Sequence, residues 1–469
     1  MPPTPSLMQS VQELVGLVAG IVWGWPMLIL LMGTGIYLTI MLRGLQFRGL
    51  WLALRLITHR DHDAEGDITH FSALMTALAA TVGIGNIVGV AGAILLGGPG
   101  AVFWMWMIGL IGMATKYAEA VLAVRYREKG PLGMRGGPMY YISRGLGLPW
   151  LGGVFAVFAA IAAFGIGNMM QSNAVAGILQ ETFGTNPAVT GLVLTVLTAA
   201  VILDGIRWIG RFTGVLVPVM IVGYCAAGLV VLALNIERIP SAFGLIFQYA
   251  FTPYAAGGGF FGFVLMQTMR YGIARGIFSN ESGLGSAPIA AAAARTQEPV
   301  MQALVSMTQT FIDTIIVCTM TALVILTGDV WMQDGIAKNV LTAASFRATL
   351  GSTGVIIVAV ATAVFAYSTL IGWSYYGEKA IEYLFGSGWV RPYRIVFVLA
   401  INVGTTVELQ AFQRWSQMDA GVRLIWDVAD VMNALMAVPN LIALVLLAGV
   451  VRRETEDFFA RRAHQLGGK

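Results

Sequence analysis

Residues 71–98 read FSALMTALAATVGIGNIVGVAGAILLGG. The segment is long and apolar enough to span a bilayer, for which about 20 residues suffice. Gly83 and Gly85 stand in its middle beside Asn86, and glycine lowers the cost of leaving a helix. Unwound backbone at membrane depth is tolerated only where it lines a polar cavity or is buried in protein. The segment therefore predicts a membrane-spanning helix that is broken at a polar site.

Composition places the whole chain in the same class. Of its 469 residues, 57% are hydrophobic and 11% are charged, against about a quarter charged in an ordinary soluble domain. So few polar residues could not cover the surface of a soluble fold of this length. Cys225 and Cys318 lie in apolar runs, which argues against a disulfide framework. The histidines stand in charged, loop-like stretches without metal-ligand spacing, so no metal site beyond sodium is expected; they are His59, His62, His70 and His464.

About 11 membrane-spanning helices are expected from a window of about 20 apolar residues. They cover about 16–42, 71–96, 100–124, 149–180, 187–204, 211–234, 259–294, 300–327, 353–384, 393–412 and 426–451. The first span is expected to be retained, because residues 1–14 lack the basic start of a cleavable signal peptide. Turn sequences such as GGPG at 97–100 separate neighbouring spans.

The basic residues test this topology independently, because cytoplasmic loops are enriched in Lys and Arg. With the N-terminus outside, the loops after odd-numbered spans and the C-terminus hold 20 of the 28 basic residues. The opposite loops hold 5, and the remaining 3 (Lys116, Arg270 and Arg275) lie within spans. The chain is thus predicted to be a multi-pass protein of the cell (inner) membrane with a cytoplasmic C-terminus.

A second expected span contains a glycine-rich interruption like that of the first. Residues 277–293 read IFSNESGLGSAPIAAAA, so Gly283–Ser286 matches Gly83–Asn86 in pattern. Pro288 removes a backbone donor and favours a fresh helix start. Glycine-rich packing is the structural alternative, and we favour it for Gly89 and Gly92. A dinucleotide-binding site is excluded, because GIGNIVG lacks the GxGxxG spacing and follows no strand.

Two such breaks at matching places of two five-helix halves, spans two to six and seven to eleven, indicate the binding site of a secondary transporter. The N-terminal end of a half-helix presents free N–H groups to a carboxylate. Freed carbonyls at the preceding half-helix end are hard oxygen ligands that suit sodium. The breaks therefore predict transport of a small zwitterionic solute.

Several long stretches of the chain resemble the alanine or glycine:cation symporter family. They are ATVGIGNIVGVAGAILLGGPGAVFWMW, KYAEAVLAVRYRE, GGPMYYI, RGIFSNESGLGSAPIAAAAA and FIDTIIVCT, within about residues 68–450. The resemblance implies an all-α membrane protein of the leucine-transporter type, with two inverted five-helix repeats, discontinuous first and sixth core helices and one extra N-terminal helix. It also implies sodium-coupled uptake of alanine, glycine or a similar small amino acid.

The corresponding division of the chain has three parts. Residues 1–62 form the extra helix and a basic loop, residues 63–451 the transporter core, and residues 452–469 a cytoplasmic tail. Within the core, repeat one covers about 68–235 and repeat two about 255–451.

The turn TVGIGN at 81–86 is similar to the AVGLGN turn of neurotransmitter:sodium symporters, and this likeness implies two sodium sites. The ligands of the two sites together are Ala79, Val82, Phe365, Ser368, Thr369, Thr81, Asn86 and Asp313. The first site combines the Ala79, Val82 and Phe365 carbonyls with the adjacent hydroxyls of Ser368 and Thr369, since positions i, i+3 and i+4 share one helix face. Bonding of these hydroxyls to their own helix is the structural alternative, and we favour sodium.

The same likeness and the polar pattern indicate a substrate pocket. Its expected residues are Thr76, Ala80, Thr81, Gly83, Gly85, Gln171, Phe278, Ser279, Asn280, Thr369 and Trp373. The amide of Gly85 would hold the substrate carboxylate. Gln171 would bond a polar group of the substrate, unless it only joins helices. Trp373 would wall off the pocket, unless it is an interfacial belt residue.

Charges within spans need partners. Lys116 and Glu119 are three residues apart and are expected to pair with each other. Arg275 and Glu281 flank the second break, so either would pair across it or hold a gate. Asp313 would reach the sodium beside Asn86 or neutralise an arginine.

Four alternative functions were weighed. Proton coupling would make Glu281 or Asp313 the proton carrier. A channel would need a repeated filter-like segment, which the sequence lacks, and a sensor would need an added soluble domain. An enzyme is disfavoured, because no nucleophile–base pair stands out. The expected partners are the amino acid, sodium and the bilayer, with no nucleic acid and no cofactor besides the coupling ion; the sequence leaves the oligomeric state open and is compatible with a monomer.

Overall fold

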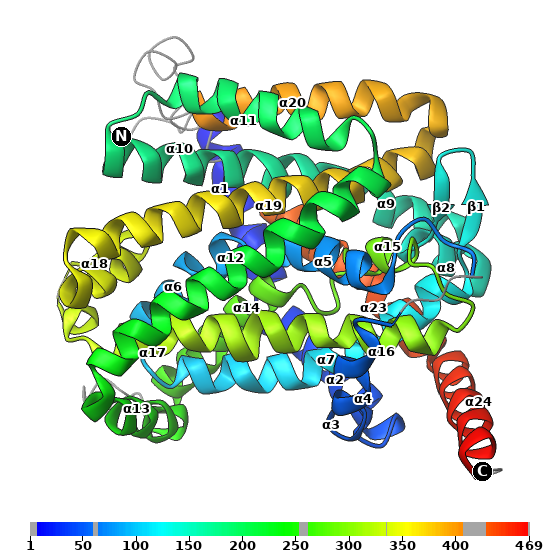
Figure 1. Ribbon diagram of the computed structural model, residues 1–469, viewed down its shortest axis with the longest axis horizontal. Coiled ribbons are helices and arrows are strands. Elements are labelled where there is room, and N and C mark those ends of the chain that lie inside the picture. The colour runs from blue at the N-terminus through cyan, green and yellow to red at the C-terminus, as the bar shows by residue number, and fades with distance from the viewer. Residues whose placement is uncertain (1–6, 60–63, 253–260, 334, 407–427, 468–469) are drawn as a thin grey trace.

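The computed structural model describes residues 7–59, 64–252, 261–333, 335–406 and 428–467, and in these ranges the chain is predominantly helical (Figure 1). Two short strands, β1 (Glu128–Gly130) and β2 (Gly133–Arg135), form an antiparallel hairpin. The sequence did not predict this short hairpin, which lies in a loop of an otherwise helical chain. Glycine at both ends of the hairpin turn permits the tight reversal, and Gly133 has a φ of 113°.

The first half of the chain forms α1 (Leu7–Val22), α2 (Trp25–Met41), α3 (Leu45–Arg48), α4 (Leu50–Leu56), α5 (His70–Thr81), η1 (Ile84–Asn86), α6 (Val88–Gly97), α7 (Ala101–Arg125), α8 (Pro138–Gly145), α9 (Pro149–Phe164), η2 (Gly165–Met169), α10 (Met170–Phe183), α11 (Pro187–Ile202), α12 (Ile206–Leu234), η3 (Ile236–Arg238) and α13 (Ile239–Phe251). The second half forms α14 (Phe261–Asn280), α15 (Pro288–Ala291), α16 (Pro299–Thr310), η4 (Phe311–Cys318), α17 (Thr319–Thr327), η5 (Val330–Met332), α18 (Lys338–Leu350), α19 (Ser352–Phe385), η6 (Ser387–Trp389), α20 (Val390–Thr406), α23 (Ala437–Leu446) and α24 (Ala448–Gly467). The segments η2 and η4 are π-helical turns inside longer helices, a feature common at functional sites.

Seven helices of the described residues are long and apolar enough to cross a membrane, and the bent pair of α5 with η1–α6 makes an eighth. The two members of this pair are inclined by 63°. The expected break in the span at 71–96 is confirmed. The last part of the expected span at 393–412 lies outside the described residues, and the count of eleven stays a prediction.

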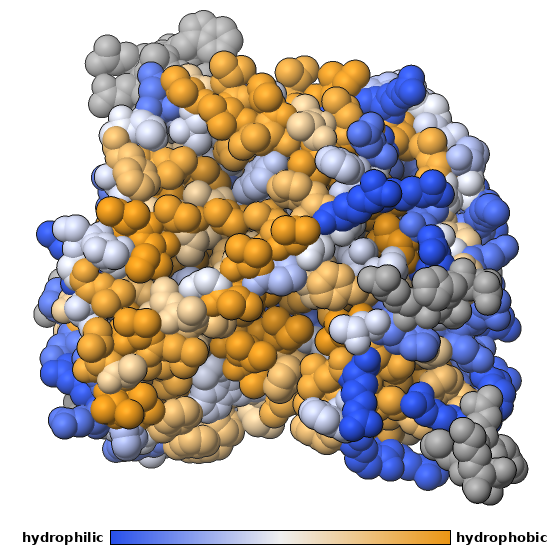
Figure 2. All heavy atoms as spheres, in the orientation of Figure 1, coloured by the Kyte–Doolittle hydropathy of each residue, from blue (hydrophilic) through white to orange (hydrophobic). Residues whose placement is uncertain are grey.

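Apolar residues cover most of the face of the molecule that Figure 2 shows. Helix α12 is an example of how this surface is formed. One of its faces exposes apolar side chains at helical spacing, namely Val215, Val219, Val222 and Leu229, whereas Val217 on another face is buried. An exposed apolar stripe of this kind is favourable against lipid and costly in water. Hydrophilic residues gather instead toward the two ends of the long helices, at α18 on one side and at the hairpin, α8 and α24 on the other (Figures 1 and 2).

Two helices and one buried histidine differ from the sequence-based expectation. Helices α13 and α18 were not expected, because each has only 13 residues, short of a span. His70 does not lie in a loop: it begins α5, is 1% exposed, and its Nδ1 lies 2.6 Å from Oε1 of Gln302.

The segment before α5 and the segment after α15 contact each other at one end of the molecule. Ile68, just before α5, forms a parallel bridge with Ala294, just after α15. The guanidinium of Arg127 donates to the carbonyl oxygens of Ala292 and Ala294 at 3.0 and 2.6 Å and also to those of Glu65 and Thr296. The two interrupted helices are therefore fastened to each other at the end that carries the hairpin.

Candidate functional site

A small cavity lies against the first break. It is lined by Ala80, Thr81, Gly83, Ile84, Gly85, Ile166, Gln171, Phe278, Glu281, Thr369, Trp373 and Asn433. These residues come from both interrupted helices, from the π-helical region of α9–α10, from α19 and from the helical stretch at 428–435. The cavity measures about 20 Å³, room for about one water-sized sphere. The walls are closed together in this conformation.

The first break is held open by neutral groups. Helix α5 ends at Thr81, Val82 is extended, and the Gly83 N–H donates to Oδ1 of Asn86 at 2.9 Å. A side chain at position 83 would place its Cβ 2.5 Å from Oγ1 of Thr369. Glycine at this position thus lets α19 approach the unwound backbone.

Carbonyl and hydroxyl oxygens meet on the α19 side of the break. The hydroxyl of Ser368 donates toward the carbonyl oxygens of Ala79, Val82 and Phe365, at 3.2, 3.4 and 2.8 Å. Thr369 donates to the Phe365 carbonyl at 3.1 Å. The oxygen atoms expected to bind sodium therefore lie close together. The bonds of Ser368 and Thr369 to the Phe365 carbonyl lie within α19, as the structural alternative expects. This set of Ala79, Val82, Phe365, Ser368 and Thr369 is called the carbonyl–hydroxyl cluster below.

A second polar group lies on the opposite side, around Asp313 of η4. The Nδ2 of Asn86 donates to Oδ1 of Asp313 at 2.7 Å, and the hydroxyls of Ser279 and Thr314 donate to its other oxygen at 2.8 Å. Asn86 and Asp313 have no solvent exposure. Since the amide nitrogen of Asn86 faces Asp313, its oxygen faces the break. We call Asn86, Asp313, Ser279 and Thr314 the aspartate cluster.

The second break is held by full charges from α7. Lys116 donates to the Glu281 carbonyl at 3.1 Å, at the end of α14. Glu119 accepts the N–H of Gly285 at 3.2 Å and the Nδ2 of Asn440 at 2.7 Å. Within the described residues the expected pair of Lys116 with Glu119 is not formed, so that prediction is wrong. Instead, the ammonium faces freed carbonyl and the carboxylate faces freed N–H, as the dipole ends of two half-helices require.

The Glu281 side chain enters the cavity from the second break. Its backbone has a φ of 55°, and Gly283 and Gly285 follow at 87° and 86°, so the chain leaves the helix through left-handed conformations. The carboxylate accepts the indole N–H of Trp373 at 2.9 Å and the hydroxyl of Ser286. This charged group therefore stands at the site together with the aromatic wall.

Comparison with known proteins decides the family. The model of the sodium:alanine symporter family matches residues 8–468. Over 456 residues the chain is 53% identical to the sodium/alanine symporter AgcS of Methanococcus maripaludis, covering 95% of this chain and 97% of that protein. The chain belongs to the sodium:alanine symporter family. It is thus a multi-pass membrane protein of a family of sodium-coupled amino-acid symporters.

Solved structures show the fold of this symporter. A manganese transporter of Eremococcus coleocola matches with a TM-score of 0.54 at 13% identity, covering 83% of each chain. MhsT, crystallised with L-phenylalanine, matches with a TM-score of 0.52 at 15% identity, covering 82% of this chain and 90% of that one. At such identities the likeness concerns the fold alone, which is that of the leucine-transporter type.

Most of the substrate residues expected from the sequence of the symporter line the cavity: Ala80, Thr81, Gly83, Gly85, Gln171, Phe278, Thr369 and Trp373. Three do not. Thr76 bonds Thr213 of α12 at 3.2 Å, while Ser279 and Asn280 bond Asp313 and Thr314. The lining also contains Ile84, Ile166, Glu281 and Asn433, which were not expected there. Asn433 could have been noticed as a polar residue within the apolar run VMNALM.

Two buried acceptors of the symporter face this cavity. Gln171 Oε1 and Asn433 Oδ1 have no hydrogen-bond partner within the part of the chain that the structure describes. A buried acceptor without a partner costs about 1–3 kcal/mol. Both atoms are therefore placed to receive donors from a bound molecule.

A larger cavity of about 170 Å³ adjoins the site on the α14 side. Arg270, Arg275 and Asp430 line it, as does Phe278, which also lines the small cavity. The Arg275 guanidinium lies 5.8 Å from the centre of the Phe278 ring. Phe278 thus separates the small cavity from the larger one.

Proposed function

We propose that this symporter imports a small neutral amino acid, alanine or glycine, together with sodium, by alternating access. The observation that carries the proposal is a closed cavity against the first break, whose backbone and side chains also bond the carbonyl–hydroxyl cluster and the aspartate cluster. Hard, neutral oxygens suit sodium on the first side. The second side offers the Asn86 oxygen and the Thr81 carbonyl, with Asp313 supplying negative charge.

The cavity lining suits an amino acid at both of its polar ends. The unwound segment provides the backbone amide of Gly85 for the carboxylate. The Glu281 carboxylate and the unpaired oxygens of Gln171 and Asn433 provide acceptors for the ammonium group. An amino acid that uses both sets would satisfy the buried acceptors, which supports a zwitterionic substrate.

The aromatic wall limits the substrate's side chain. Trp373 is 1% exposed, and a Cβ added at Gly167 would lie 2.4 Å from the Cβ of Trp373. The indole is held on its other side by Glu281 at 2.9 Å. Because both contacts fix Trp373, a large side chain could enter only by displacing it, which favours alanine and glycine. Phe278, between the two cavities, would be the residue that moves to admit the substrate.

The topology belongs to the same proposal. It comprises about 11 spans, two inverted repeats (68–235 and 255–451), an extra N-terminal helix and a cytoplasmic C-terminus. Support comes from the grouping of α4, α8, the hairpin and α24 at one end of the molecule, since these elements carry or adjoin many of the 20 basic residues (Figure 1).

Proton coupling is the second candidate, because Glu281 and Asp313 are buried carboxylates at the site. Uptake of labelled alanine into proteoliposomes separates the two. We expect an inward sodium gradient to drive accumulation and potassium to fail. Accumulation that ignores sodium and follows an imposed proton gradient would overturn sodium coupling. Competition by unlabelled glycine and phenylalanine tests whether Trp373 limits the size of the substrate's side chain. Glycine should reduce the uptake of labelled alanine, and phenylalanine should not.

A further inference from the structure

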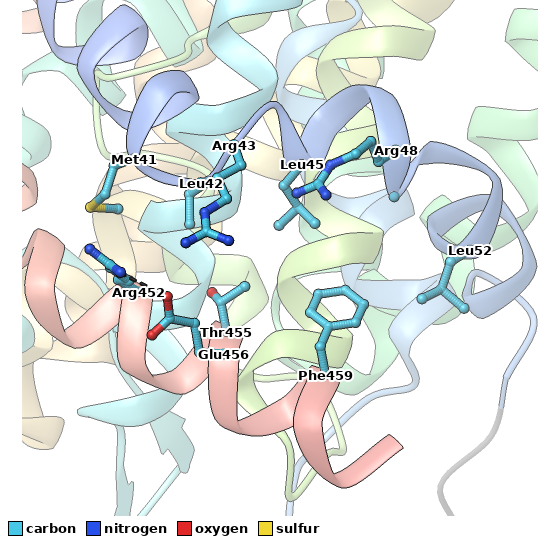
Figure 3. A pocket seen from close by; sticks show the side chains of 11 residues that line it. Met41, Leu42, Arg43, Leu45, Arg48, Leu52, Arg452, Thr455, Glu456 and Phe459 are labelled. Carbon is cyan, nitrogen blue, oxygen red and sulfur yellow. Dashed lines mark hydrogen bonds and ion pairs between the residues drawn. The ribbon is translucent and has the colours of Figure 1, made fainter. Parts of the chain in front are cut away.

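A separate cavity of about 460 Å³ lies between the N-terminal and C-terminal helices, far in sequence from either break (Figure 3). Its walls are the end of α2, the helices α3 and α4, and the outer face of α24. The lining residues are Met41, Leu42, Arg43, Leu45, Arg48, Gly49, Leu52, Arg452, Thr455, Glu456 and Phe459. The proposed transport cycle uses none of them.

Three arginines border this cavity. In Figure 3 the guanidinium groups of Arg43 and Arg48 approach the space from above, and Arg452 lies across from Arg43. Arg452 pairs with Glu456 at 2.8 Å. Neither Arg43 nor Arg48 has an ion-pair partner within the described residues. The cavity therefore has a net positive border.

The backbone conformation of Arg43, which lines the cavity, is energetically unfavourable. Its φ is 55°, a left-handed conformation that disfavours residues with a Cβ by about 1 kcal/mol. The following Gly44 has a φ of 65° and adopts the same region freely. A reversal of this kind is usual with glycine, so an arginine at position 43 is a strained choice that places charge at the cavity.

Apart from Thr455 and Glu456, the remaining side chains of the lining are apolar. Leu45, Leu52 and Phe459 form its inner surface (Figure 3). Beside it, Ile40, Phe47 and Trp51 are 72%, 59% and 66% exposed. Exposed aromatic rings next to arginines are typical of the boundary between bilayer and water. The cavity therefore combines arginine side chains with adjoining apolar surface.

We infer that this cavity binds an anionic phospholipid, with its phosphate between Arg43, Arg48 and Arg452 and an acyl chain along Leu45, Leu52 and Phe459. Basic pockets between membrane helices bind acidic headgroups in this way. A free phosphate would use the arginines but leave the apolar surface uncovered. The lipid would join α3 and α4, which precede the first break, to α24, which follows the last span.

Native mass spectrometry of the full-length protein in a neutral detergent tests this inference. Dihexanoyl phosphatidylglycerol is titrated against dihexanoyl phosphatidylcholine, with glycerol 3-phosphate and inorganic phosphate as the chain-free arms. We expect phosphatidylglycerol to bind at least about tenfold more tightly than phosphatidylcholine, and the chain-free anions not to saturate. Arg43→Gln with Arg48→Gln should weaken phosphatidylglycerol binding about 25-fold, since one arginine near the surface contributes about fivefold.

The matched control is Arg453→Gln with Arg462→Gln, two charge removals on α24 outside the lining. It should leave phosphatidylglycerol binding within about twofold of the wild type. Equal binding of both lipids, or equal loss in both double variants, would overturn the site. Tight binding of inorganic phosphate would assign the arginines to a free anion and overturn the lipid. If the Arg43/Arg48 variant does not fold, the wild type still decides, because binding at these arginines must weaken as salt rises from about 0.05 to 0.5 M.

Discussion

In the two interrupted helices, different kinds of groups bond the backbone N–H and carbonyl groups that each break leaves free. At the first break, the freed backbone is held by neutral atoms: the Asn86 side-chain oxygen accepts the Gly83 N–H, and the Ser368 hydroxyl donates to the carbonyls of Ala79 and Val82. At the second break, the two half-helix ends are held by Lys116 and Glu119, two full charges from a single helix. Neutral groups can exchange their partners for an ion or a substrate at modest cost, whereas a buried charge cannot lose its partner cheaply. In the proposed function, the first break therefore binds the ligands, and the second supports the structure and presents Glu281.

Removing one charge at the second break should have the largest effect. Glu119→Ala leaves the Gly285 N–H and the Asn440 amide without their charged acceptor, and it removes the carboxylate whose charge acts on Lys116 without direct contact. We expect a loss of about 3–5 kcal/mol in the free energy of unfolding, seen as a large fall in the thermal midpoint of the detergent-purified protein. Glu237→Ala, in the exposed η3 segment, is the control and should not shift it.

The double variant Lys116→Met with Glu119→Gln sharpens the same test. It removes both charges together, so it should recover part of the stability that Glu119→Ala loses. A Glu119→Ala protein with the thermal midpoint of the wild type would contradict the assigned role of the charges.

The next effect concerns the aspartate cluster, where Asn86 of the first break bonds the Asp313 carboxylate. Asp313→Asn keeps the shape but turns an acceptor into a donor against Asn86 or against Ser279 and Thr314. Since hydrogen bonds to charged groups contribute about 1.5–3 kcal/mol, we expect the sodium concentration for half-maximal uptake to rise at least about tenfold. Asp329→Asn, on the exposed surface, should leave sodium activation unchanged. An unchanged sodium curve for Asp313→Asn would remove this residue from the ion site.

Sequence patterns predicted the first break better than the second, for a physical reason. Ser368, Thr369 and Phe365 share a helix face by local spacing, and the glycines that unwind residues 83–86 are adjacent in sequence. The partners of Lys116 and Glu119 are 165 to 321 positions away. Local spacing suggested that Lys116 and Glu119 pair with each other. Instead, each binds a backbone group at an end of the second interrupted helix: the Glu281 carbonyl and the Gly285 N–H. Asn433 and Ile166 were missed because only tertiary packing brings them to the cavity.

Ser368→Ala with Thr369→Ala probes the neutral side of the first break. Two hydroxyl ligands at about 1 kcal/mol each should weaken sodium activation of uptake about 30-fold, with a small loss of stability. Ser374→Ala is the matched control, because its buried hydroxyl bonds the Ile371 carbonyl of the same helix at 2.7 Å. If the double variant and Ser374→Ala both keep the sodium curve of the wild type, the Ser368 and Thr369 hydroxyls are not sodium ligands.

The smallest effect is expected just before the first break, at Thr76. This residue is fully buried in α5, and its hydroxyl bonds the Ser72 carbonyl at 2.8 Å and the Thr213 hydroxyl at 3.2 Å, away from the cavity. Thr76→Val keeps the volume and removes one bond between α5 and α12, so the free energy of unfolding should fall by about 1 kcal/mol. The KM for alanine and the sodium curve should stay within about twofold of the wild type. A tenfold rise in KM without loss of stability would mean that α5 turns Thr76 toward the substrate in another state of the cycle. The ligand-binding part of the first half-helix would then extend a full turn before the break, whereas the described contacts limit it to residues 79–86.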